Sequence, residues 1–198
     1  TIVYSTKGVT WTASTINSTT SLSNTNLTAM AFSGSTLMAV GQGGTVLTSG
    51  DGVTWTAQAT NITQNLNAVA ISPSVTTTIP AATTVSAFWI AVGDAGAVYV
   101  SSDGITWTAQ ATNITQNLNA VAVSTGVTTT LPAVATTSTF WVAVGDAGAV
   151  YTSVDGVTWT AQNTGLESVT TAWRGVSVLV NTTSILDCGV GSPAVTSI

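Results

Sequence analysis

Apolar and polar residues alternate in short blocks along this chain, and turn residues separate the blocks. Residues 66–72 read Leu-Asn-Ala-Val-Ala-Ile-Ser, an alternation that is typical of a half-buried β-strand. Residues 88–92 are apolar at every position, which favours a strand that is covered on both faces. No stretch has the apolar spacing of an amphipathic helix. The pattern therefore predicts an all-β protein.

These blocks belong to a repeated unit of four short strands joined by hairpins. In the clearest copy we expect strands at 66–72, 88–92, 97–100 and 106–110, a tight turn at 93–96 and a threonine-rich connection at 73–87. The next copy has matching strands at 118–124, 140–144 and 149–152, followed by Trp159. An earlier copy is shorter because its corresponding connection spans only 33–35.

A heptad, Ser-x-Asp-Gly-x-Thr-Trp, marks each unit at 49–55, 101–107 and 153–159, and a degenerate copy at 5–11 has Lys7 in place of aspartate. The copies begin 44, 52 and 52 residues apart. The aspartate accepts turn amides, the glycine adopts a conformation that other residues resist, and the tryptophan packs beneath, so we expect a structural role rather than catalysis. The turn residues are Ser49, Asp51, Gly52, Thr54, Trp55, Ser101, Asp103, Gly104, Thr106, Trp107, Ser153, Asp155, Gly156, Thr158 and Trp159.

Strands that are apolar on both faces need a neighbouring sheet on each side. Radially stacked small sheets meet this need, so we expect residues 1–198 to form one domain, a β-propeller of four four-stranded antiparallel blades. A linear β-solenoid is the alternative, but its repeats are usually shorter.

The two ends of the sequence supply different parts of the repeat. Residues 1–4 read as a third strand, 173–180 as a first, 184–190 as a second and 194–198 as the start of another third. From Ser153 to the last residue is 45 positions, and five more reach Ser5, which makes one repeat. We therefore expect one blade to combine both termini. Closure within one molecule is favoured, and completion by a neighbouring subunit is the alternative.

Charge is scarce, at 5 % of residues, with two cations (Lys7 and Arg174), seven carboxylates and no histidine. Nucleic acids and anionic membrane surfaces require clustered cations, so neither is an expected partner. No apolar run approaches the roughly 18 residues of a membrane-spanning helix, so we expect no membrane insertion. With so few titrating groups, we expect similar melting temperatures near pH 2 and pH 7.

Several features indicate an extracellular protein. Candidate N-glycosylation sites of the form Asn-x-Ser/Thr stand at Asn17, Asn26, Asn61, Asn113 and Asn181. Glycans and surface hydroxyls would supply the solubility that charge does not. The single cysteine, Cys188, excludes an internal disulfide, and we expect it to be a small buried side chain, with an intermolecular disulfide as the alternative. Because the chain starts at Thr1 without a signal peptide, we expect a processed or trimmed chain.

The heptad resembles the Asp-box, or bacterial neuraminidase repeat, although it is one residue shorter than the fullest form. The wider unit, 92–99 leading into 101–107, looks like the repeats of photosystem II assembly-factor propellers. The resemblance implies a β-propeller. It does not carry the activities over, because sialidases use an arginine triad and the assembly factors a basic patch, whereas Arg174 is the only arginine here.

We therefore expect a non-enzymatic secreted structural protein that assembles from copies of itself into a filament, sheath or surface layer. The alternative is a carbohydrate-binding or adhesive module, for which Trp173 beside Arg174 is the candidate contact, because Trp89 and Trp141 read as core. We expect no catalytic residue, cofactor or metal. Asp94 and Asp146 occupy equivalent turns, and Glu167 and Asp187 are isolated in sequence.

Overall fold

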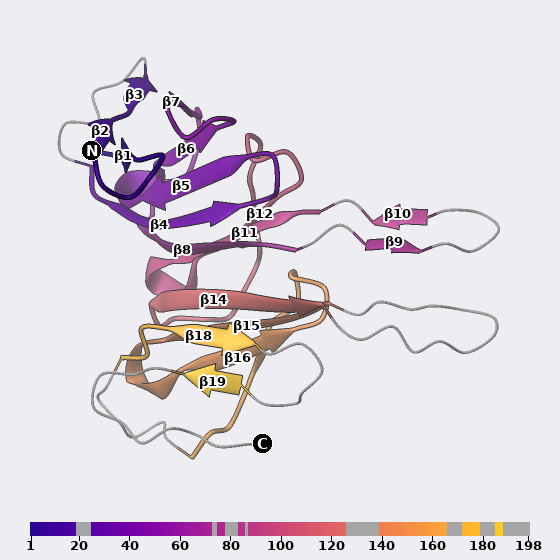
Figure 1. The fold of residues 1–198 in the computed structure, drawn as a ribbon. Helices are drawn as coiled ribbons and strands as arrows, with labels where there is room; N and C mark the ends of the chain where they lie inside the picture. The colour runs from indigo at the N-terminus through magenta and orange to yellow at the C-terminus, as the bar shows by residue number, and fades with distance from the viewer. Residues whose placement is uncertain are drawn as a thin grey trace.

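The computed structural model describes residues 1–18, 25–72, 75–77, 83–85, 87–125, 139–165, 172–178 and 185–187. This part of the chain consists of β-strands and three short 3-10 turns, with no α-helix (Figure 1). The expected all-β class is confirmed. The candidate third strand at 194–198, the connection at 126–138, Cys188, Glu167 and Asn181 lie outside the described residues.

Three sheets contain the complete repeats, and each has the four expected strands in antiparallel order. The first sheet has β4 (Leu27–Phe32), β5 (Leu37–Gly41), β6 (Val46–Ser49) and β7 (Thr54–Ala57). The second has β8 (Leu66–Ile71), β11 (Trp89–Gly93), β12 (Val98–Ser101) and β13 (Thr108–Ala109). The third has β14 (Leu118–Thr125), β15 (Thr139–Gly145), β16 (Val150–Ser153) and β17 (Thr160–Ala161).

The turns between the second and third strands are 3-10 turns: η1 (Gln42–Gly44), η2 (Asp94–Gly96) and η3 (Asp146–Gly148). In η2, Ala95 has a φ of 53° and Gly96 a φ of 71°. The sequence predicted a tight turn here and assigned positive φ to glycine, whereas the structure also places an alanine in the left-handed region.

The remaining strands form three separate pairs and one addition to the first sheet. β1 (Val3–Tyr4) pairs with β2 (Thr12–Ala13), and β18 (Val176–Val178) pairs with β19 (Ile185–Asp187). One edge strand and one hairpin were not predicted. β3 (Thr15–Asn17) joins the edge of β7 in parallel, and β9 (Val75–Thr77) and β10 (Thr83–Val85) form a hairpin within the threonine-rich connection.

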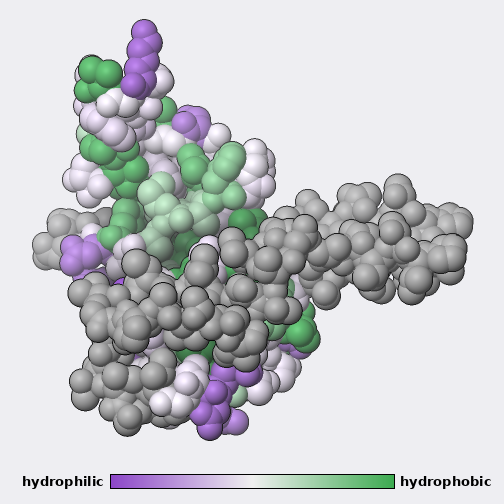
Figure 2. All heavy atoms as spheres, turned by 60° about the horizontal axis from the view of Figure 1, so that its bottom comes forward, coloured by the Kyte–Doolittle hydropathy of each residue, from purple (hydrophilic) through white to green (hydrophobic). Residues whose placement is uncertain are grey.

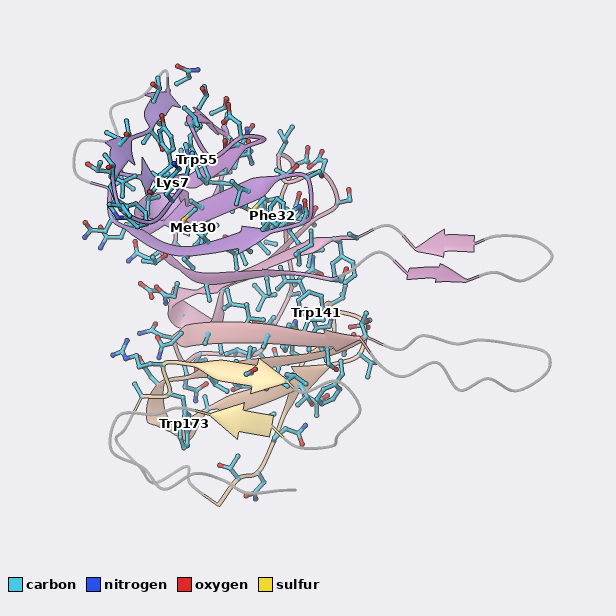
Figure 3. The ribbon with its side chains drawn as sticks, viewed as in Figure 1. Lys7, Met30, Phe32, Trp55, Trp141 and Trp173 are labelled. Atoms are coloured by element: carbon cyan, nitrogen blue, oxygen red, sulfur yellow. The ribbon has the colours of Figure 1, made fainter. Side chains whose placement is uncertain are left out.

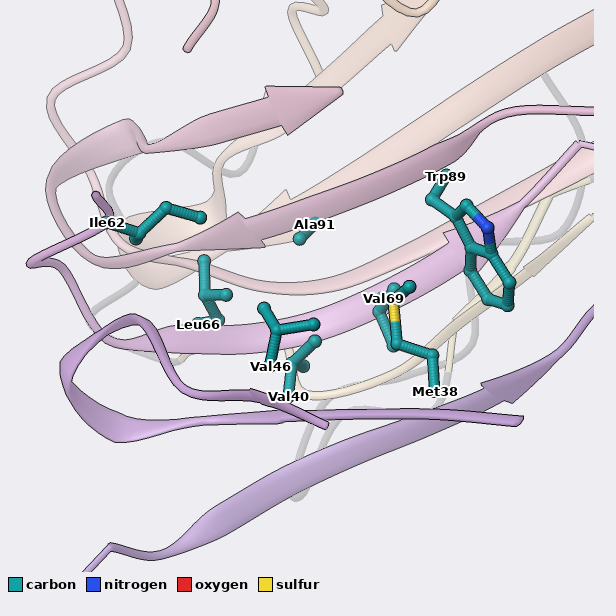
Figure 4. Packing of buried hydrophobic residues seen from close by; sticks show 8 residues of the cluster. All are labelled: Met38, Val40, Val46, Ile62, Leu66, Val69, Trp89 and Ala91. Atoms are coloured by element: carbon teal, nitrogen blue, oxygen red, sulfur yellow. The ribbon is translucent and has the colours of Figure 1, made fainter. Parts of the chain in front are cut away.

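The sheets pack face to face in a row, and the second strand of each sheet is buried on both faces. Met38, Ala39 and Val40 of β5 are completely buried, and the equivalent residues of β11 and β15 are at most 2 % exposed. Between the first two sheets, Met38 and Val40 lie against Val69 of β8, as Figure 4 shows. The expectation that these strands need cover on both sides is confirmed.

The row is open in the described part of the chain. The pair β1–β2 and the pair β18–β19 are separate two-stranded sheets, and Figure 1 shows them at opposite ends of the row. Ile2 is buried against the first sheet, beside Leu47 and Trp55, while Val176 packs against the third sheet. Closure of a ring within one molecule is therefore not seen, because each pair is packed on the sheet nearest to it in sequence.

Candidate functional site

The heptad turns are held by hydrogen bonds within each heptad. In the second sheet, Asp103 Oδ1 accepts the backbone amides of Ile105 and Thr106 at 2.8 and 2.7 Å, and Ser101 Oγ accepts the amide of Gly104 at 2.8 Å. The turns at Asp51 and Asp155 have the same bonds. The glycine has a positive φ in each of the three. These bonds account for the serine, aspartate and glycine that recur in the three regular heptads.

The hydrogen bonds stabilise the charged form of each heptad aspartate. Amides of Thr106 and Ile105 lower the pKa of Asp103 to about 2. Amides of Thr54 and Val53 likewise lower the pKa of Asp51. At Asp155 burial acts to raise the pKa, but the equivalent hydrogen bonds outweigh it and the pKa is lowered. The hydrogen bonds place the carboxylates in the turn structure. Because they lower the pKa values, we expect stability to fall in acid, in contrast to the indifference to pH expected from composition.

The tryptophan packs beneath the turn in the three regular copies but not in the degenerate one. Trp55 is 1 % exposed and its Nε1 donates to Gly52 O, whereas Trp11 is 61 % exposed. The expected anchor role of Trp11 is therefore wrong in this structure. The side chain of Lys7 has no oxygen that could accept the turn amides. In this turn the structure describes one of the heptad bonds, from the amide of Gly8 to Ser5 Oγ.

Asparagine side chains link neighbouring sheets, a feature that sequence reasoning missed. Asn67 Nδ2 donates both to Asp94 Oδ1 at 2.9 Å and to the carbonyl of Leu118 in the next sheet at 3.0 Å. Asn65 Nδ2 donates to the other oxygen of Asp94 at 2.8 Å. The signal was the repeated Asn-Leu-Asn at the start of the first strand. Asp94 and its equivalent Asp146 are thus bound in structural networks, in line with the expected turn role.

The same position forms a series of bonds along the row, which we call the inter-sheet ladder. In each case a side chain on the first strand of one sheet donates to a carbonyl at, or a few residues before, the start of the first strand of the next sheet. The donor and acceptor pairs are Thr28 Oγ1 to Leu66 O, Asn67 Nδ2 to Leu118 O, and Asn119 Nδ2 to Trp173 O. The ladder fixes the spacing of successive sheets.

An apolar surface lies on the first sheet, on the face turned away from the second sheet. Met30 and Phe32 of β4 are 52 % and 57 % exposed. Figure 3 shows both residues on β4, near the N-terminal end of the row. We call this pair the β4 patch. The sequence analysis did not single it out, although Val69 and Ile71 occupy the equivalent positions on β8 and are packed against the preceding sheet.

The proposed contact pair of Trp173 and Arg174 is not an exposed pair. Trp173 is 5 % exposed and packs with Val142 and Val144, so its assignment as a contact aromatic is wrong. Trp173 occupies the position of Leu66 and Leu118 in the repeat. The sequence analysis missed this equivalence because a tryptophan stands where the other copies have leucine. Arg174 itself is exposed. Trp89 and Trp141 are buried, and their assignment to the core is confirmed.

A half-open groove lies between the segment after β13 and the heptad turn of the third sheet. Its lining includes Asn113, Tyr151 and Trp159. Trp159 Nε1 donates to Gly156 O, and Tyr151 donates to the side-chain carbonyl of Gln116. The polar groups of both aromatic residues are therefore already used within the chain.

The candidate glycosylation sites, a metal site and a membrane-spanning helix are the remaining features considered from the sequence. Asn17, Asn26, Asn61 and Asn113 are exposed. Among the described residues, no group of three or more His, Cys, Asp or Glu side chains is placed to hold a metal ion, and no helix is long and apolar enough to cross a membrane. No protein-family model and no curated protein matches this chain.

Proposed function

We propose that this chain is a non-enzymatic structural protein that assembles from copies of itself into an extracellular filament, sheath or surface layer. The observation that carries the proposal is the pair of open ends of the row. The β4 patch exposes Met30 and Phe32 at one end, at positions that are packed between sheets elsewhere. A face built for sheet packing, and left without a sheet, favours association with another protein surface.

The low charge of the chain supports self-association. In the coloured part of the face in Figure 2, hydrophobic and weakly polar residues predominate, with strongly hydrophilic residues at scattered positions. With charges at 5 % of residues and a formal net charge of −5, copies repel one another weakly. The heptad aspartates, which are among those few charges, accept backbone amides within their own turns.

We also propose that the sheets are blades of a β-propeller-like arrangement built from Asp-box-type repeats. The face-to-face packing, the four-stranded antiparallel order and the inter-sheet ladder support this arrangement. The exposure of Asn17, Asn26, Asn61 and Asn113 supports a glycosylated protein outside the cell. A carbohydrate-binding role would use the groove near Trp159, but the internal hydrogen bonds of Tyr151 and Trp159 favour the structural role.

Electron microscopy of the native material tests the proposed function. We expect ordered filaments or lattices whose smallest repeating unit is one chain. Dispersed single chains at every concentration would overturn the proposal. Glycan-array binding by dispersed chains would favour the carbohydrate-binding alternative instead.

A further inference from the structure

The two small sheets at the ends of the row are complementary halves of one repeat. We call β1–β2 the N-terminal half-sheet and β18–β19 the C-terminal half-sheet. Val3 pairs with Ala13 as Leu47 pairs with Ala57, so the N-terminal half-sheet corresponds to the third and fourth strands. In the other half-sheet, Val176 pairs with Asp187 as Val69 pairs with Ala91 of β11, which makes its strands the first and second.

The β4 patch lies where a first and second strand are missing. On β8, Val69 and Ile71 pack against Met38 and Val40 of the preceding sheet, which belong to its second strand. The same face of β14 packs against β11, and that of β18 packs against β15. Among the described residues, the N-terminal half-sheet lies in front of the first sheet, and Ile2, next to β1, takes part in the packing. In this part of the chain no second strand faces Met30 and Phe32, and both are exposed.

We propose that the C-terminal half-sheet of one copy joins the N-terminal half-sheet of a second copy to form one four-stranded sheet. This inference rests on the proposed self-assembly and names its contact. β19 pairs with β1 of the second copy, in the order β18–β19–β1–β2. The register follows from the second sheet, where Ile90 lies opposite Val100 and Ala91 opposite Tyr99. By this correspondence, Leu186 lies opposite Tyr4, and Asp187 opposite Val3, of the second copy.

A second copy fits better than the same chain because both half-sheets are already held at opposite ends of the row. Figure 3 shows Trp173, next to the C-terminal half-sheet, at the end away from the β4 patch. Ile2 and Val176 are packed on different sheets, with the second sheet between them. Joining two copies leaves both packings intact and adds cover to Met30 and Phe32. The contact is heterologous, so repetition extends the row or closes a ring of several copies.

The inter-sheet ladder continues across the same contact. Asn119 donates to the carbonyl of Trp173. Arg174 follows Trp173 as Asn67 follows Leu66, so Arg174 has the position of the next donor. Arg174 is exposed in the single chain. In the joined arrangement its guanidinium faces the start of β4 in the second copy, where Leu27 occupies the position of Leu66 and Leu118. The one arginine of the chain thus serves as the donor between copies.

Paired cysteines test the contact directly. In a Cys188→Ser background, one chain carries Tyr4→Cys and a second chain carries Leu186→Cys, and the two are mixed and oxidised. We expect a disulfide-linked dimer only in the mixture, because residues opposite each other in antiparallel strands bring their Cβ atoms within about 5.5 Å. The control replaces Tyr4→Cys by Val3→Cys, whose side chain points to the opposite face of β1. We expect no linked dimer with the control.

The remaining outcomes separate this contact from the proposed function. A linked dimer with Val3→Cys but not Tyr4→Cys would overturn the register. A chain with both Tyr4→Cys and Leu186→Cys that oxidises only within itself, at high concentration, would overturn the exchange between copies. Filaments without any linked dimer would overturn this contact and leave self-assembly standing, whereas single chains at all concentrations would overturn both. Sedimentation of an Arg174→Ala variant gives a second measurement. We expect this variant to associate more weakly than the unaltered chain. Unchanged association would contradict the ladder contact.

Discussion

At the scale of single residues, aspartate acts as a hydrogen-bond acceptor that shapes turns. Each aspartate whose side chain the structure describes accepts hydrogen bonds, in the heptad turns from backbone amides and at Asp94 and Asp146 from asparagine amides. The sequence predicted the heptad bonds because their donors and acceptors lie within three residues. It did not predict the asparagine partners, because Asn65 and Asp94 are 29 residues apart.

The heptad aspartates predict a loss of stability in acid. The pKa of Asp103 is about 2 in the folded chain and 3.8 in its ordinary state, so folding favours the carboxylate. The stability it contributes is present above its unfolded pKa and is lost as pH falls through its folded pKa. Asp51 and Asp155 are shifted in the same direction. We expect the melting temperature to be flat from pH 7 to about 4 and to fall between about 4 and 2.

An Asp103→Asn variant is the matched test of this dependence. The amide cannot ionise, so its melting temperature is lower than that of the unaltered chain at pH 7 and differs less from it at pH 2. The measurement is thermal unfolding of both proteins at the two pH values. Equal melting temperatures of the unaltered chain at pH 2 and pH 7 would show that the aspartate bonds do not contribute to stability.

At the scale of elements, the glycine that ends the second strand allows two backbones to approach closely. A Cβ atom on Gly93 would lie 1.9 Å from the carbonyl oxygen of Asn65, and Gly41 and Gly145 have equivalent contacts with Asn26 and Asn117. The φ of Gly93 is −164°, which any residue adopts, so the restriction is one of space. The contact lets the turn amide of Asp94 donate to Asn65 O at 3.1 Å.

Gly93→Ala should therefore destabilise the chain by about 1 to 3 kcal/mol, because backbone atoms must move to admit the methyl group. Gly50→Ala is the control, since nothing lies within 4 Å of a Cβ atom there. We expect the control to change stability by less than about 0.5 kcal/mol. Urea unfolding measures both. Equal effects of the two substitutions would contradict the close approach at Gly93.

The sequence predicted the positions of strands that have a local pattern of alternation and turn residues. Strands β8, β11 and β12 agree with the predicted ranges to within a residue or so, because alternation and glycine turns are local signals. The fourth strand of the second sheet, β13, is shorter than the expected range 106–110. In the first sheet β7 is longer than β13 and β17, and β3 pairs with its outer edge. That pairing joins segments about 40 residues apart, so it could not be predicted from a local sequence pattern. Trp11 was misassigned for a related reason, because its burial depends on a neighbouring sheet.

At the scale of the whole molecule, residue counting showed that the two ends make up one repeat but not where the ends lie. The arithmetic is the same for a ring closed within one chain and for a contact between chains. The described part of the structure places the two half-sheets at opposite ends of an open row, which favours a contact between chains. The open ends, the β4 patch and the low charge together support our proposal that copies associate end to end.

Light scattering across a range of concentrations tests this claim most directly. The unaltered chain should give a mass that rises with concentration above the 19.8 kDa of one chain. A Met30→Asp, Phe32→Asp double variant should remain at the mass of one chain, because two carboxylates cannot be buried against an apolar strand. Val154→Asp, at an exposed apolar residue of a heptad turn, is the control and should associate like the unaltered chain. An unaltered chain that stays at 19.8 kDa at every concentration would contradict the account.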